Sequence, residues 1–162
     1  MKQLIRKIAL LMVACVVTSA VGYAQTAPTI QTMIDEMVKK YETTEDVTCF
    51  KAEKGSGLGM LKLMFNKQFG RDFMRGVTSI TIIEYGDASE EVCQALHQDL
   101  EAFASLLEEF KDDEKKSSNH SYFRSFGSIE AADRSLSDFI IAIEDEETKM
   151  MMHMGGKIIV DK

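Results

Sequence analysis

The chain has 162 residues and a formal net charge of −7 at pH 7. A chain of this size forms one domain that buries about two thirds of its unfolded surface in a single core. Its negative charge repels nucleic-acid phosphates and anionic lipid surfaces, which disfavours nucleic-acid binding but leaves room for a local basic patch.

The first 24 residues have the three-part pattern of a secretory signal peptide. Three basic side chains open the segment, residues 8–21 are almost wholly apolar, and residues 22–24 offer the small residues that a signal peptidase reads. The apolar run is too short for a good membrane-spanning helix, which needs about 20 apolar residues. The sequence therefore predicts export to the periplasm or beyond.

Cleavage after Ala24 would leave residues 25–162 as a single domain without a transmembrane segment. The removed leader holds three basic and no acidic residues, so the net charge would fall from −7 to −10. Lipid attachment at Cys15, which follows Ala14, is the alternative, and it would anchor the protein instead of releasing it.

A helix is predicted from its cap at Thr29 to about Tyr41, because apolar residues recur there at steps of three and four. A short strand is predicted over residues 47–52. Glycines then break the chain, and a second, apolar helix is predicted over residues 58–69.

This second helix is expected to bury its apolar side chains and to expose its polar ones. The residues expected to face inward are Leu58, Leu61, Met64 and Phe65, and those expected to face outward are Lys62, Asn66 and Lys67. Residues 70–76 are predicted as a loop that tucks Phe73 and Met74 inward.

The clearest strand covers residues 77–85, where nearly every side chain is β-branched. The longest helix is predicted from Ser89, or from Asp87 with Glu90, to about Phe110. Its expected buried stripe consists of Val92, Leu96, Leu100, Phe103, Leu107 and Phe110.

The remainder of the chain has no helical period. A polar connection over residues 111–119 leads into a strand over 121–126 and a polar loop or short helical turn over 128–135. The further extended segments cover residues 136–144, 148–154 and 157–160, with a charged hairpin tip at 145–147 and a bend at 155–156.

This order predicts a two-layer α+β domain. We expect a mixed or mostly antiparallel sheet of four to six strands, with about three helices packed on one face. The C-terminal strands are expected to form a meander, because short turns join them.

The element order and apolar pattern from residue 29 to 160 resemble a family of small exported proteins. The isoleucine-rich segment 77–83 and the methionine-rich strand that ends at Gly155-Gly156 are part of this likeness. The family is the type catalogued as domain of unknown function 4252, from gut-dwelling Gram-negative anaerobes. The resemblance implies an envelope-facing or secreted α+β domain and carries no catalytic residues.

Cys49 and Cys93 remain after cleavage of the leader. An oxidising compartment permits a disulfide between them, which would close a loop of 44 positions. Such a bridge is worth roughly 4 kcal/mol in the chain-entropy model. The alternative, two buried free thiols, follows from the strong tendency of cysteine to be buried.

The segment Met150 to Met154 has four methionines and His153, whose thioethers and imidazole suit a soft metal such as Cu(I). A strand, however, alternates its faces. Met150, Met152 and Met154 would then share one side, with Met151 and His153 on the other. Core packing is the favoured reading, since methionine fills irregular gaps.

Cys93, His97 and Glu101 follow one ridge of the predicted long helix, since residues four apart are neighbours. Two chemical roles are possible for this pair. Cys93 could be a thiol nucleophile with His97 as its base, or the two residues could be two ligands of a zinc ion. The ridge borders the apolar stripe and no fourth ligand is evident. A structural interpretation is therefore favoured, in which Cys93 lies at the edge of the core and His97 at its boundary with solvent.

Other chemical signals are weak. The glycine-rich run 54–59 matches neither a P-loop nor a dinucleotide fingerprint. The acidic clusters 112–114 and 144–147 lack the ligand spacing of an EF-hand and are expected to be solvated. Asn119 begins an Asn-x-Ser sequon, whose glycosylation is not expected after a bacterial-style export signal.

We therefore assign no catalytic, cofactor-binding or metal-ligating residue from the sequence. The expected function is a non-catalytic binding or regulatory domain whose partner is an envelope or secreted protein. The alternative is copper binding or thiol enzymology at Cys93 and His97. A binding domain should expose an apolar patch of several hundred Å², on a free sheet face or at an edge strand.

Overall fold

A six-stranded antiparallel sheet runs through the molecule, with the strand order β1-β2-β6-β5-β4-β3. The computed structural model describes residues 29–110, 122–130, 135–146 and 148–159. The elements in chain order are α2 (Ile30–Tyr41), β1 (Thr48–Glu53), α3 (Leu58–Phe69), α4 (Arg71–Gly76), β2 (Val77–Glu84), α5 (Glu90–Ala104), β3 (Glu108–Glu109), β4 (Tyr122–Glu130), β5 (Ser135–Glu144) and β6 (Lys149–Ile159).

The predicted α+β class and the C-terminal meander of β4, β5 and β6 are confirmed, and the sheet, predicted as mixed or mostly antiparallel, is antiparallel with six strands. The predictions for the leader, for Cys15, for the connection 111–119 and for the sequon at Asn119 lie outside the described residues. Within the described part of the chain, no helix has the length and apolar character needed to cross a membrane.

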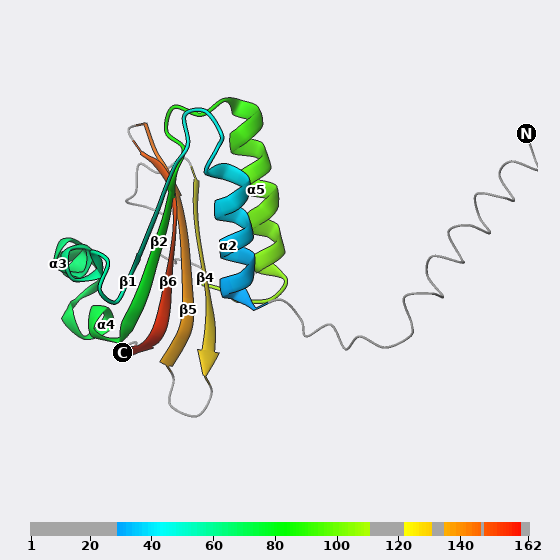
Figure 1. Cartoon of the computed structure of the whole chain (residues 1–162). Coiled ribbons are helices and arrows are strands. Elements are labelled where there is room, and N and C mark those ends of the chain that lie inside the picture. The colour runs from blue at the N-terminus through cyan, green and yellow to red at the C-terminus, as the bar shows by residue number, and fades with distance from the viewer. Residues whose placement is uncertain (1–28, 111–121, 131–134, 147, 160–162) are drawn as a thin grey trace, which may run out of the picture.

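The helices are divided between the two faces of the sheet instead of lying together on one (Figure 1). Helices α2 and α5 cover one face, over a core that includes Ile83, Ile140 and Met151. Helices α3 and α4 lie on the other face, over a core that includes Ile80 and Met152. The cause is visible in the sequence, since β2, β5 and β6 are apolar on both faces and both faces therefore need cover.

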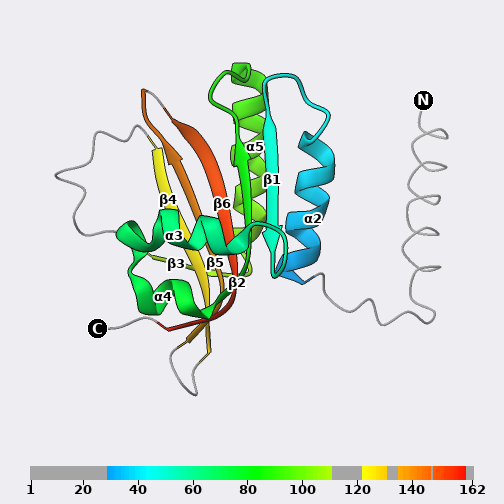
Figure 2. The same cartoon turned by 60° about the vertical axis from the view of Figure 1, so that its left-hand side comes forward.

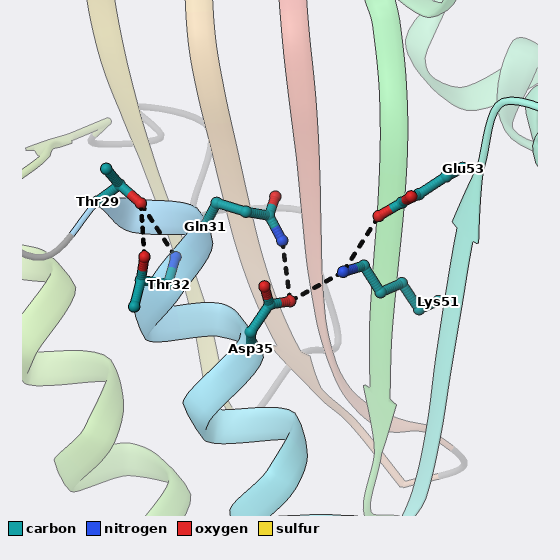
Figure 3. Close-up of polar contacts among 6 residues, drawn as sticks. All are labelled: Thr29, Gln31, Thr32, Asp35, Lys51 and Glu53. Atoms are coloured by element: carbon teal, nitrogen blue, oxygen red, sulfur yellow. Dashed lines mark hydrogen bonds and ion pairs between the residues drawn. The ribbon is translucent and has the colours of Figure 1, made fainter.

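Helix α2 is fixed to the edge strand β1 by polar contacts (Figure 3). Thr29 caps the helix, and its hydroxyl accepts a hydrogen bond from the Thr32 amide at 3.2 Å. Lys51 Nζ on β1 lies 2.9 Å from Asp35 Oδ1 and 3.1 Å from Glu53 Oε1. The hydrogen bond from Lys51 holds the pKa of Asp35 below its usual value. The pair is partly exposed, so it orients α2 more than it stabilises the fold.

Four elements differ from the prediction. Residues 71–76, predicted as a loop, form the short helix α4, although Met74 is buried as expected. The long helix α5 begins after the Ser89 cap but ends at Ala104 instead of near Phe110, because the chain turns there into β3. Strands β4 and β6 are longer than predicted, and β6 continues through Gly155 and Gly156, where its pairing with β2 and β5 shifts register.

Candidate functional site

The methionine-rich segment is part of the core. Met152 and Met154 are buried under α3 and α4, and Met150 packs against the same cluster. Met151 is buried on the opposite face, under α2 and α5. The alternation of β6 therefore splits the set, as expected. Among the described residues, no group of three or more His, Cys, Asp or Glu side chains is placed to hold a metal ion.

His153 is held as a core histidine. It is fully buried, and its Nε2 lies 2.8 Å from Asp138 Oδ1 on the neighbouring strand β5. Its Cα partner on the other side is Thr81 of β2, which is also buried. The Asp138 contact fixes the ring in the sheet and satisfies one of its two nitrogens.

Cys93 and His97 do not form the Cys-His-Glu line that their spacing suggested. Cys93 is only 4% exposed and is a member of the core under α5. Its sulfur lies 3.8 Å from Lys149 Nζ. Glu101 pairs with Arg124 on β4 instead of with His97. A buried thiol in such a position is a packing residue and not an accessible nucleophile.

Glu144 is the partner of His97 that the sequence did not reveal. His97 Nε2 lies 2.5 Å from Glu144 Oε1, across 47 positions of sequence. The buried Tyr85 hydroxyl donates to the same oxygen at 3.1 Å, and the Tyr122 ring stacks on His97 with centroids 4.3 Å apart. Glu144 was expected in a solvated hairpin tip. Instead its side chain links β5 to His97 of α5 and to Tyr85, which directly follows β2, in one polar cluster.

Cys49 and Cys93 are both free in this structure. Cys49 is half-buried on β1, and burial, with a smaller effect of the Glu42 carboxylate, raises the pKa of its thiol. A raised pKa lowers the thiolate fraction at neutral pH, and with it the reactivity of the sulfur. Cys49 therefore lacks the features of an activated nucleophile.

A shallow hollow lies between α2 and α5 on their outer side. Its volume is about 230 Å³ and its lining includes Met33, Met37, Asp99 and Phe103. Lys40 Nζ and the Tyr41 hydroxyl both bond to Asp99 Oδ2 there, at 2.6 and 2.7 Å. Ligand pockets usually enclose about 300–1,000 Å³, so this hollow is small for a substrate site.

The most unusual surface lies on α3. Met60, Leu63 and Met64 are 72%, 74% and 63% exposed. They recur at steps of three and four and therefore share the outer side of the helix. Met64 was expected to face inward, and this prediction is wrong. Figure 2 shows α3 crossing in front of the strands, with no other described element over its outer side.

Aromatic contacts on the inner side of α3 determine which side of the helix faces outward. Phe69 stacks on Phe73 of α4 with ring centroids 5.3 Å apart, and Phe73 meets Phe139 of β5 edge-to-face at 5.6 Å. Lys62, expected in solvent, lies at the side of the helix, where its Nζ donates to the Arg75 carbonyl oxygen at 3.3 Å. These contacts hold the aromatic side of α3 on the sheet and leave Leu63 and its neighbours outside.

Basic side chains accompany this exposed apolar stripe. Lys67 follows Leu63 and Met64 by one helical turn, and Arg71 and Arg75 are exposed on α4. Lys62 and Lys54 add to the same segment. Residues 54–76 hold five Lys or Arg and one acidic residue, whereas the rest of the chain after residue 28 holds 11 basic and 25 acidic residues.

We call this region the α3–α4 surface. It consists of Met60, Leu63, Met64, Lys67, Arg71 and Arg75. Both sheet faces carry helices, so these exposed apolar side chains lie on a helix and not on a free sheet face. The glycine-rich turn that precedes α3 puts Gly57 in the left-handed region at φ 84° and gives the helix no side-chain cap.

The α3–α4 surface is thus apolar along its ridge and basic around it, while helix α5 across the sheet has four acidic and no Lys or Arg residues. Comparisons with protein-family models, with curated proteins and with solved structures found no match to this chain.

Proposed function

We propose that this protein is an exported, non-catalytic binding domain that engages its partner through the α3–α4 surface. The family resemblance of its sequence implies the same class of protein. The observation that carries the proposal is the exposure of Met60, Leu63 and Met64, three large apolar side chains in one stripe. Single exposed apolar residues are ordinary, but a contiguous stripe of them is typical of an interaction site.

The composition of α3 supports this function. The helix has apolar residues on all sides, and such a helix is usually buried on all sides. Here the fold covers only its inner side, with Leu58, Phe65 and Phe69. Methionine side chains are flexible and are frequent on surfaces that adapt to a partner. The buried positions of Cys93 and Met152 favour binding over the alternative of thiol or copper chemistry.

Site-specific photocrosslinking in the cell that makes the protein tests this proposal. A photoreactive amino acid at position 63 should give a discrete adduct with a protein or a lipid. The control position is Gln98, which is exposed on α5, on the other side of the sheet. Absence of an adduct at position 63, or the same adduct at both positions, would contradict the proposal.

A further inference from the structure

We propose that the partner of the α3–α4 surface is a membrane surface that contains anionic lipids. In this arrangement Met60, Leu63 and Met64 enter the boundary between headgroups and acyl chains. Lys67, Arg71 and Arg75 contact the anionic headgroups. This inference rests on the proposed function, because it names the partner of the same surface.

Charge is the first observation that favours a lipid surface. Residues 54–76 carry a net charge of +4, from five basic residues and Asp72, in a chain whose total is −7. Apolar residues on one side of a helix with Lys and Arg beside them are the pattern of helices that lie in a membrane interface. Each Lys or Arg close to an anionic leaflet strengthens the attraction.

Size is the second observation. The exposed stripe consists of only three large side chains, whereas a stable protein–protein interface buries about 800 Å² and about 20–30 residues on each partner. The aromatic residues of α3, which would serve as anchors in a protein interface, are turned inward, as the stacking of Phe69 on Phe73 shows. A stripe of three exposed apolar side chains on one helix suits shallow insertion into lipid better than docking to a protein.

The acidic remainder of the protein does not prevent this contact. Helix α5 holds Glu90, Glu91, Asp99 and Glu101, but it lies on the other face of the sheet. Two layers of about 10 Å each separate it from α3. The Debye length at physiological salt is about 8 Å, so repulsion from that face is largely screened at the membrane. The local positive charge of residues 54–76 therefore orients the protein, with α3 toward an anionic surface.

Tryptophan fluorescence tests the inference directly, because the chain contains no tryptophan. Leu63→Trp and Gln98→Trp are made separately in the full chain, so both carry the same N-terminus. Each is titrated with vesicles of phosphatidylglycerol and phosphatidylcholine in equal parts, and with phosphatidylcholine alone. Brominated lipids then report whether the tryptophan reaches the acyl region.

We expect a blue shift and bromine quenching for the tryptophan at position 63 with the anionic vesicles, and neither for the one at position 98. Adding Lys67→Glu and Arg71→Glu to the Leu63→Trp chain should weaken the vesicle affinity at least tenfold, since two of the three headgroup contacts are reversed in charge. A rise in salt should weaken it as well. Met64→Trp is the second reporter if Leu63→Trp does not fold.

Three outcomes would overturn the inference. The first is no shift at position 63 or 64 with anionic vesicles, and the second is an equal shift at position 98. The third is equal affinity for vesicles of phosphatidylcholine alone. A crosslinked protein adduct at position 63 together with no shift on vesicles would reject the lipid partner and leave the proposed binding function intact.

Discussion

Substitution of Gly76 by alanine is expected to destabilise the protein by roughly 3 kcal/mol or more, because the new methyl group has no room. A Cβ atom on Gly76 would lie 1.9 Å from the Lys157 carbonyl oxygen and 2.9 Å from the Ile158 Cα. These are backbone atoms of β6 and cannot rotate away. The clash lies where α4 passes into β2, so α4 or the β2–β6 ladder must move.

Urea denaturation of the purified protein measures this effect. Gly59→Ala is the matched control, since Gly59 lies inside α3 and a Cβ there meets nothing within 4 Å. That change should stabilise the protein by about 0.5–1 kcal/mol, because alanine is the better helix former. Equal unfolding free energies for the two variants would show that α4 does not approach β6 as described.

Alkaline pH is expected to lower the free energy of unfolding steeply above about pH 10, where tyrosines of the unfolded chain ionise. Burial and the Asp99 carboxylate raise the pKa of Tyr41 to about 12. Burial and the Glu144 carboxylate raise the pKa of Tyr85 as well. The folded state thus keeps both hydroxyls neutral while the unfolded state loses the protons. The contribution of these two tyrosines to the free energy of unfolding is therefore fully present below pH 10. It is lost as the pH rises toward their pKa values in the folded state.

The size of the effect follows from linkage, at about 1.4 kcal/mol per pH unit for each such tyrosine. Denaturant titrations between pH 8 and 12 should show a shallower slope for Tyr85→Phe than for the unchanged protein, by about one proton. At pH 7 this variant should lose about 1.5–3 kcal/mol, for its hydrogen bond to the Glu144 carboxylate. Identical slopes would mean that Tyr85 is not buried beside Glu144.

Much of the fold was predictable because local signals agreed with the tertiary structure. Thr29 and Ser89 are the predicted caps, and α3 covers the predicted residues 58–69. Alternation in the strands gave the correct faces for Met150 to Met154. The division of the helices between two faces was not predicted, although the unbroken apolar runs of β5 and β6 were a signal for cover on both sides.

The candidate site was harder to predict for a physical reason. Helix α3 has apolar residues around its whole circumference, so its sequence does not determine which side faces the sheet. The choice is made by Phe69, Phe73 and Phe139, which meet only after the chain has folded. The contact between His97 and Glu144 also forms only after folding, because the two residues are 47 positions apart in the sequence. The excess of basic residues over 54–76 can be counted in the sequence. The net charge of the whole chain is negative, however, and does not reveal this local excess.

The interaction surface exists only if Leu63 lies outside the core, and a matched pair of substitutions in one helix tests this directly. Leu63→Gln changes a side chain that is 74% exposed, and Leu58→Gln changes one that is 7% exposed. In urea denaturation we expect Leu63→Gln to stay within about 0.5 kcal/mol of the unchanged protein and Leu58→Gln to lose about 2 kcal/mol or more. A loss at Leu63 as large as that at Leu58 would contradict the orientation of α3 and, with it, the proposed binding surface.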